Sequence, residues 1–181
     1  MHDEAVAALA RHATVRRNGA ARPPGRAVIV DIDGVLADTS ARQHLLERPG
    51  GGRNWDAFFA AAGDDLPYSV VPAMTRDLPT DTVAVLVSGR PDWLADLTVD
   101  WLTRHGLRWD LLLVRRRGDR TGAARFKRAV LSGVRDAGFV VAVAIDDDER
   151  VTTMYVAEGI PTVVAVEAGS VVEPRQIPPH D

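Results

Sequence analysis

The sequence predicts a three-layer α/β fold, in which a central, mainly parallel sheet lies between two layers of helices. Short apolar runs of strand length alternate with amphipathic helical patterns along most of the chain. The runs are apolar throughout, as expected of strands that are covered on both faces. Glycine follows each of three helical patterns, where a C-terminal cap is common. With 181 residues, the chain can form one domain with a sizeable core.

The first elements are an N-terminal helix, a linker and a buried strand. Residues 1–26 begin with a short amphipathic pattern and end in a linker, residues 18–26, that is rich in proline and glycine. The first strand is expected over residues 27–32, where three β-branched residues are consecutive. We therefore place the start of the core domain, residues 27–170, at this strand.

The later elements alternate regularly. Strands are expected over residues 82–87, 111–114, 140–145 and 162–166, and helices over residues 91–105, 123–137 and 149–158. Such alternation implies right-handed crossovers between parallel strands. The last residues, 171–181, contain several prolines and are expected to form a flexible tail.

The alternation breaks between the first two strands, where roughly forty residues, about 39–79, form a longer connection than a simple crossover needs. This segment contains a glycine-rich turn followed by Trp55, Phe58 and Phe59. The aromatic residues are consistent with a crossover helix and a small satellite core. The second interpretation is a small cap that covers the strand ends and shields a site from water. Both interpretations can hold together.

Composition excludes several classes of protein. The chain has no cysteine, which rules out disulfides and thiolate chemistry, and its formal charge of −3 gives no general attraction to nucleic acid or anionic lipid. No apolar stretch reaches the length of a membrane span, and the N-terminus lacks the features of a secretory signal. We expect a cytoplasmic protein with no membrane association.

Two acidic residues mark the end of the first strand. Asp31 and Asp33 directly follow the apolar run, and Gly34 allows a sharp turn after them. Ligands of open α/β sheets bind beyond the carboxyl ends of the strands. A pair of carboxylates at this place suits a divalent cation and a nucleophile, which indicates phosphate chemistry.

Two further strands end in polar residues. Ser88, Gly89 and Arg90 follow the second strand, and Pro91 suits the first turn of the next helix, whose free amides could face an anion. Four consecutive acids, residues 146–149, follow the strand at 140–145. Asp148 and Glu149 are explained by a helix N-terminus, whereas Asp146 is better explained as a metal ligand.

Lys127 is the only lysine among 22 basic residues. Where the identity of the cation is unimportant, this chain uses arginine, so a retained lysine indicates a need for a compact ammonium group beside phosphate and carboxylate. A surface lysine with no such role is the alternative. Arg115 and Arg116 belong to a basic run around Lys127 that could follow a polyanionic substrate or simply be solvated.

Together these segments, DIDGVLAD, VSGRP, Lys127 and AIDDDER, resemble the four motifs of the haloacid dehalogenase superfamily, in order and on the matching elements. The resemblance implies a Rossmann-like fold with a small cap insertion after the first strand. It implies Asp31 as the nucleophile and Asp33 as the acid and base, with Ser88 and Lys127 as ligands of the phosphoryl oxygens. It also implies Mg²⁺ bound by Asp31, the carbonyl of Asp33 and Asp146, with support from Asp147.

A second set of residues has a spacing similar to that in the phosphatase domain of polynucleotide kinase-phosphatase. The set consists of Arg90, Arg115, Gly118, Asp119, Lys127 and Met154-Tyr155. That family removes 3′-phosphates from nucleic acid ends and nucleotides, which makes Arg90, Arg115 and Arg116 candidate substrate ligands beside Ser88, Gly89 and Lys127. The chain departs from the family pattern at Ala123 and Ala124, where an acid is common, and at Tyr155, which stands in place of tryptophan. No G-x-x-x-x-G-K-[ST] loop occurs, so no kinase site is expected in this chain.

Four functional interpretations follow. The first is an Mg²⁺-dependent hydrolase of 3′-phosphates on nucleic acid ends or nucleotides, and the second is a phosphatase of small nucleotide or sugar phosphates. A non-catalytic phosphate-binding module of the same fold is the third, although such a module would be expected to lose at least one site residue. A phospho-acceptor signalling domain is disfavoured because no aspartate directly ends the strands at 82–87 or 111–114. The oligomeric state is not predicted.

Overall fold

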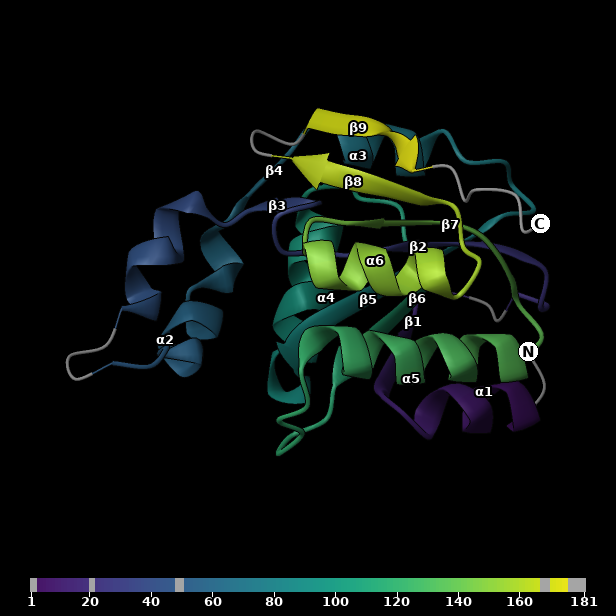
Figure 1. Ribbon diagram of the computed structural model, residues 1–181, viewed down its shortest axis with the longest axis horizontal. Coiled ribbons are helices and arrows are strands. Elements are labelled where there is room, and N and C mark those ends of the chain that lie inside the picture. The colour runs from purple at the N-terminus through teal and green to yellow at the C-terminus, as the bar shows by residue number, and fades with distance from the viewer. Residues whose placement is uncertain (1–2, 20–21, 48–50, 167–169, 176–181) are drawn as a thin grey trace.

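A computed structural model describes residues 3–19, 22–47, 51–166 and 170–175 of the chain. Its main feature is a seven-stranded sheet with helices on both faces (Figure 1). The strand order is β1-β6-β5-β2-β7-β8-β9. The strands are β1 (Thr14–Arg17), β2 (Arg26–Val30), β5 (Val83–Pro91), β6 (Leu111–Arg115), β7 (Val140–Asp146), β8 (Thr162–Val166) and β9 (Ser170–Arg175).

The five inner strands are parallel, and the two edge strands, β1 and β9, are antiparallel to their neighbours. The chain runs from β2 outward to β5 and β6, and then crosses over β2 to continue with β7 and β8. The direction of winding therefore changes between β2 and β7. In sheets of this kind, this change opens a crevice at the carboxyl ends of the strands.

Two apolar clusters, one on each face of the sheet, form the core. Ala27 and Ile29 of β2 pack with α1 (Asp3–Ala10), α5 (Ala123–Asp136) and α6 (Glu149–Ala157). Val28 and Val30 face the other way and pack with residues of α3 (Val70–Arg76) and α4 (Ala95–Arg104). The alternation of the side chains along β2 thus produces the three layers.

A second, two-stranded sheet belongs to a segment that projects from the carboxyl edge of the main sheet (Figure 1). This segment, called the insertion below, comprises β3 (Ala37–Asp38), η1 (Ser40–Leu46), α2 (Trp55–Ala60), η2 (Ala62–Asp64) and β4 (Leu66–Pro67). Asn54 caps the start of α2, because its side chain accepts a hydrogen bond from the amide of Ala57. The small insertion after the strand that carries Asp31 confirms the fold predicted from the sequence.

The structure differs from the sequence-based prediction at several ends of elements. β5 extends to Pro91, so the following helical segment, η3 (Asp92–Leu94), begins one residue later than expected. Residues 14–17 form the edge strand β1, which pairs with β6. Residues 170–175, which were expected to belong mainly to a loose tail, form β9 and pair with β8, because β8 would otherwise be an open edge. The remaining tail, 176–181, lies outside the described residues.

Gly106, Gly138 and Gly159 each adopt a positive φ angle directly after a helix, as predicted for C-terminal caps. None of the described helices is both long enough and apolar enough to cross a membrane.

Candidate active site

The register of the central strands brings three predicted site residues to one edge of the sheet. Val30 of β2 pairs with Leu86 of β5 on one side and with Ile145 of β7 on the other. Asp31 follows Val30, and Asp146 follows Ile145, so the two acids lie side by side at the point where the winding changes. Ser88 lies at the corresponding end of β5.

A tight turn carries the chain away from Asp31. The carbonyl of Ile32 accepts hydrogen bonds from the amides of Leu36 and Ala37, at 2.9 and 2.8 Å. Gly34 adopts a φ of +82°, and a Cβ atom there would overlap the Asp147 carboxylate, lying 2.8 Å from its Cγ. Glycine is therefore needed for the backbone conformation and for the approach of Asp147.

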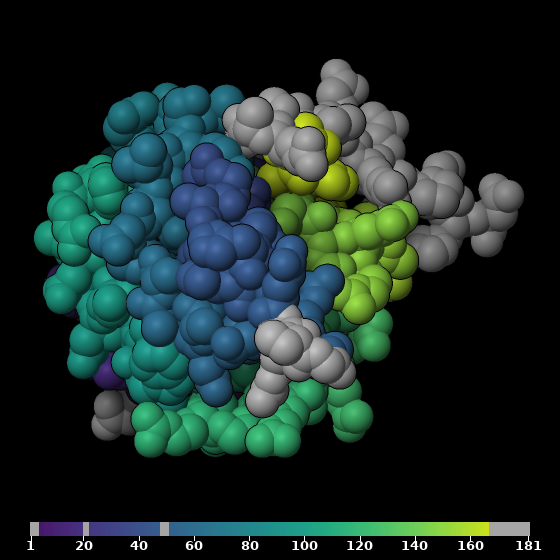
Figure 2. All heavy atoms as spheres, turned by 90° about the vertical axis from the view of Figure 1, so that its left-hand side faces the viewer, coloured from purple at the N-terminus to yellow at the C-terminus, as the bar shows by residue number. Residues whose placement is uncertain are grey.

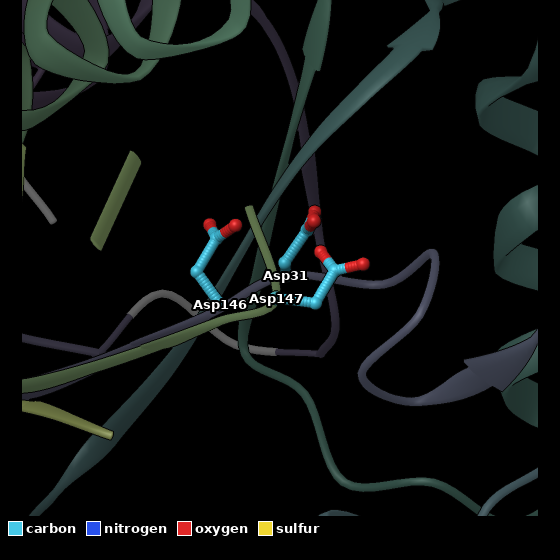
Figure 3. A group of neighbouring side chains, drawn as sticks. All are labelled: Asp31, Asp146 and Asp147. Atoms are coloured by element: carbon cyan, nitrogen blue, oxygen red, sulfur yellow. The ribbon is translucent and has the colours of Figure 1, made fainter. Parts of the chain in front are cut away.

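Asp31, Asp146 and Asp147 form a cluster of carboxylates at the ends of β2 and β7 (Figure 3). One oxygen of each lies within 4.8 Å of the others. Asp31 and Asp146 are buried, whereas Asp147 is at the exposed rim. Burial, and then the charges of Asp146 and Asp33, raise the pKa of Asp31 to about 7 against the opposing effect of Lys127. Although Asp147 lies at the rim, partial loss of solvent around its carboxyl group and then the charge of Asp31 raise the pKa of Asp147 to about 7.

Lys127 joins the two buried acids. Its Nζ lies 2.6 Å from Asp146 Oδ2 and 2.9 Å from Asp31 Oδ2. Although burial disfavours its charge, the two carboxylates raise the pKa of Lys127, so it remains a cation. The other oxygen of Asp146 accepts a hydrogen bond from the amide of Asp148 at 3.2 Å. The arrangement fixes Asp146 at both oxygens but Asp31 at only one.

Asp31 Oδ1 is buried, and no hydrogen-bond donor of the described residues reaches it. A buried oxygen without a partner is costly, and such atoms in native proteins commonly face a ligand. Here it lies in a cluster of hard carboxylate oxygens, which is the donor set preferred by Mg²⁺. The residues present could therefore hold a divalent metal ion.

Asp33 has different surroundings from the acidic cluster. Its Oδ1 lies 2.7 Å from Arg90 Nη2 and 2.5 Å from Arg42 Nη2. Burial acts to raise its pKa, but the charges and hydrogen bonds of Arg90 and then Arg42 lower the pKa of Asp33 below its usual value. Asp33 is therefore a carboxylate in this arrangement.

Sequence reasoning missed Arg42 and Asp65. Arg42 is buried, with its guanidinium bonded to Asp33 and Asp65 and to the carbonyl of Phe58 at 3.1 Å. The carboxylate of Asp65 also forms an ion pair with Arg90, with Oδ2 and Nη2 3.4 Å apart. The backbone carbonyl of Asp65 accepts a hydrogen bond from the indole of Trp101. Arg42 is one of four arginines in residues 39–79, and nothing in the local sequence distinguishes this buried arginine from a solvated one.

Two polar residues in the last part of β5 are buried. Ser88 is fully buried, and its Oγ accepts a hydrogen bond from the amide of Arg90 at 3.2 Å. Arg90 is also fully buried, and besides Asp33 it contacts Thr98 Oγ1 at 3.2 Å. At Gly89, a Cβ atom would meet open space, so this backbone is accessible. Arg90 is thus directed into the protein toward Asp33.

Arg115 and Arg116 have partners within the protein. Arg115 Nη1 donates to the carbonyl of Thr121 at 2.7 Å, and its guanidinium lies over the ring of Phe126. Arg116 donates to the carbonyl of Ala10. In this conformation, the two arginines hold the loop before α5 rather than extending freely.

Asp148 and Tyr155 have structural roles. Asp148 caps α6 by accepting a bond from the amide of Arg150 at 2.9 Å, as the sequence predicted for a helix N-terminus. Tyr155 is fully buried, so its ring packs in the core and cannot stack on a base.

Comparison with known proteins gives one family match. A family model described as the polynucleotide kinase PNKP phosphatase domain matches residues 25–170. A comparison with curated protein sequences found no match.

Solved structures with the same fold include proteins described as parts of a Pnkp1/Rnl/Hen1 complex and of the Pnkp1/Rnl/Hen1 RNA repair complex. Their TM-scores are 0.62 and 0.60, at 23% identity, over 82% and 83% of this chain and 47% and 45% of theirs. The class C acid phosphatase from Bacillus anthracis, with tungstate bound, gives a TM-score of 0.52 at 15% identity, over 81% of this chain and 58% of its own. This chain thus spans about half the length of the first two structures.

Proposed function

Because this chain belongs to the family of polynucleotide kinase phosphatase domains, which is of the haloacid dehalogenase type, we propose that it is an Mg²⁺-dependent phosphomonoesterase. We propose further that it removes 3′-phosphates from nucleic acid ends or nucleotides through an aspartyl-phosphate. The observation that carries the proposal is the environment of Asp31: one oxygen is held by Lys127, and the other is buried without a partner. An oxygen in that state is available to attack phosphorus.

Mg²⁺ would be held by Asp31, Asp146 and the carbonyl of Asp33, with Asp147 in support. When bound, it would supply charge neutralisation on the phosphoryl oxygens. The Lys127 ammonium, fixed beside Asp31, supplies a second positive charge at the same place, and Ser88 supplies a hydroxyl. Phosphoryl transfer depends mainly on such positioning and electrostatic stabilisation.

In the first step, Asp31 Oδ1 attacks phosphorus, and the bond between phosphorus and the ester oxygen breaks. The departing alcohol takes a proton from Asp33, and the phosphoryl group stays on Asp31 as an acyl phosphate. In the second step, water loses a proton to Asp33 and attacks phosphorus, which releases inorganic phosphate and restores Asp31.

Asp33 must hold a proton for the first step, although Arg90 and Arg42 lower its pKa in the described arrangement. A dianionic phosphate ester that approaches Asp33 raises its pKa and competes for the same guanidinium groups. The two arginines thus keep Asp33 as the carboxylate that the second step needs, and substrate binding promotes its protonation for the first.

The substrate part of the proposal rests on the family match and on one structural neighbour that is described as an RNA repair complex. The test is phosphate release with Mg²⁺ from 3′-phosphorylated RNA and DNA oligonucleotides, a 3′-mononucleotide, a 5′-mononucleotide and glycerol phosphate. We expect the 3′-phosphorylated ends to give the highest kcat/KM. A preference for the 5′-mononucleotide or glycerol phosphate would instead indicate a small-metabolite phosphatase.

Two controls accompany the panel. Asp31→Asn is expected to abolish turnover with little change in the melting temperature measured without metal, and EDTA is expected to abolish turnover of the unmodified protein. Asp100→Asn, which removes an exposed acid on α4, should retain full activity. Residual turnover of Asp31→Asn above about one per cent of the original would mean that another group is the nucleophile. No release from any substrate would contradict the proposed phosphatase.

A further inference from the structure

The insertion presents an exposed aromatic surface whose role is not explained by folding. Trp55 and Phe59, on the first and second turns of α2, are stacked with their ring centroids 5.6 Å apart and an angle of 25° between the rings. Phe58 meets Trp55 edge-on at 5.7 Å. The three rings differ sharply in exposure, because Phe58 is 4% exposed, Phe59 is half-buried and Trp55 is 45% exposed.

This difference divides the cluster into a core part and a surface part. Phe58 fills the satellite core of the insertion and lies against the guanidinium of Arg42, whose carbon is 3.9 Å from the ring centroid. Trp55 leaves nearly half of its surface in water, although it starts a helix that could have carried a polar residue there. Phe58 thus fills the core, whereas Trp55 presents ring surface to the solvent.

A cation accompanies the exposed ring. The guanidinium carbon of Arg53, an exposed residue, lies 5.5 Å from the centroid of Trp55. An aromatic ring with an adjacent guanidinium is the combination that holds single-stranded nucleic acid, because the ring stacks on a base and the cation attracts the phosphate backbone. Stacking of this kind needs an unpaired base.

The aromatic surface is connected to the proposed catalytic residues through one side chain. The carbonyl of Phe58 accepts a hydrogen bond from Arg42, and the same guanidinium bonds Asp33 at 2.5 Å. The guanidinium group of Arg42 therefore links α2 directly to Asp33. Figure 2 shows the face at the carboxyl edge, with the insertion in blue at its centre and residues of α6 in light green beside it. The insertion thus lies over the edge from which a substrate would reach Asp31.

We propose that Trp55, Phe59 and Arg53 form a stacking platform that binds an unpaired base of a single-stranded nucleic acid whose 3′-phosphate enters the site. This proposal rests on the proposed function and deepens it, because it selects a single-stranded end over a free sugar phosphate. The platform contributes to binding of the strand and takes no part in the chemical step.

The test compares Trp55→Ala with the unmodified protein on a 3′-phosphorylated single-stranded oligonucleotide and on glycerol phosphate, which has no base. Loss of one stacking contact should raise KM for the oligonucleotide by about 5- to 100-fold, with kcat nearly unchanged. The kinetics on glycerol phosphate should stay the same. Trp55→Phe, which keeps an aromatic ring, should recover most of the binding.

Trp93→Ala is the matched control. Trp93 is 43% exposed, about as much as Trp55, but it lies in η3, outside the insertion. Its neighbour Asp92 accepts a hydrogen bond from Thr14 of β1, which places η3 toward the far edge of the sheet. Trp93→Ala should leave KM for the oligonucleotide unchanged. An equal rise of KM for oligonucleotide and glycerol phosphate in Trp55→Ala would show a merely structural role and overturn the platform.

A binding measurement separates failure of the platform from failure of the proposed function. Tryptophan fluorescence is titrated with a single-stranded oligonucleotide that has no 3′-phosphate, so no turnover is needed. We expect quenching that is lost in Trp55→Phe and retained in Trp93→Phe. Quenching that persists in Trp55→Phe, or that never occurs, overturns the platform. A protein that shows the expected quenching but prefers glycerol phosphate as a substrate overturns the proposed function alone.

Discussion

At the scale of single residues, Lys127 contacts two buried acids and is placed to stabilise charge on the phosphoryl oxygens. The broader guanidinium group of an arginine is less suited to this position. The Lys127 ammonium is compact enough to lie between Asp31 and Asp146, at 2.9 and 2.6 Å, in a buried site. If it stabilises charge on the phosphoryl oxygens, Lys127→Ala should lower kcat for glycerol phosphate on the order of 10²-fold or more. Arg128→Ala, which removes the adjacent but exposed cation, should lower it very little. An unchanged rate in Lys127→Ala would contradict the assigned role.

Gly34 provides a second test at this scale, because two separate constraints apply to it. Its φ of +82° strains any other residue, and a Cβ atom would overlap the carboxylate of Asp147. Gly159 has a similar φ, +77°, but open space around the position of a Cβ atom. Gly159→Ala should therefore lower the free energy of unfolding by about 1 kcal/mol and leave phosphate release unchanged.

Gly34→Ala should lower the free energy of unfolding by at least as much and, in addition, abolish most of the phosphate release. Unfolding in denaturant and initial rates at saturating Mg²⁺ measure the two effects. Equal activity in the two glycine variants would mean that the approach of Asp147 is irrelevant to the reaction.

At the scale of elements, the sequence predicted the strands that carry the site but not the contacts of the insertion. A buried parallel strand leaves a plain signal, because its residues are apolar on both faces, and the acids after β2 and β7 interrupt that signal at the edge of the sheet. Arg42 and Asp65 leave no such signal, since each is a charged residue in a polar segment. Their burial depends on a contact across 23 positions, which local patterns do not encode.

The edge strands were missed for a related reason. β1 has four residues, two of them arginines, and only its pairing with β6 makes it a strand. β9 contains Pro174, which argues against a strand except at an edge, where one side of the backbone needs no partner in the sheet. Both elements are defined by tertiary pairing rather than by local propensity.

The packing of α1 against α5 gives a prediction for whole elements. A Cβ atom at Gly133 would lie 3.0 Å from the carbonyl oxygen of Ala8 and 3.2 Å from His12, so the two helices approach closely because this side chain is absent. Gly133→Leu should therefore force α1 away and lower the free energy of unfolding by about 1–3 kcal/mol or more. Ser132→Leu, at an exposed position of the same helix, should change it by less than about 0.5 kcal/mol. Chemical denaturation measures both, and equal effects would contradict close packing at Gly133.

At the scale of the whole molecule, the carboxylates of the site repel one another, and a bound metal ion would relieve this repulsion. Asp31, Asp146 and Asp147 bring three carboxylates within 4.8 Å, and among the described residues Lys127 is the only cation that forms an ion pair with this cluster. An ion that binds the folded chain but not the unfolded one stabilises it by about 2.7 kcal/mol at one hundred times its Kd. For a domain of this size, we expect Mg²⁺ to raise the melting temperature by roughly 5–10 °C, an increase that EDTA reverses.

Two substitutions in adjacent acids locate the origin of that increase. Asp147→Asn removes a charge from the cluster, so its melting temperature without metal should be equal or higher, because repulsion with Asp31 is relieved, while the increase with Mg²⁺ should shrink. Asp148→Asn keeps the cap of α6, since asparagine caps helices about as well as aspartate, and should keep the full increase. If Mg²⁺ stabilised both variants equally, the ion would be bound elsewhere. The two buried acids, Asp31 and Asp146, would then share the single charge of Lys127 as their counter-charge among the described residues.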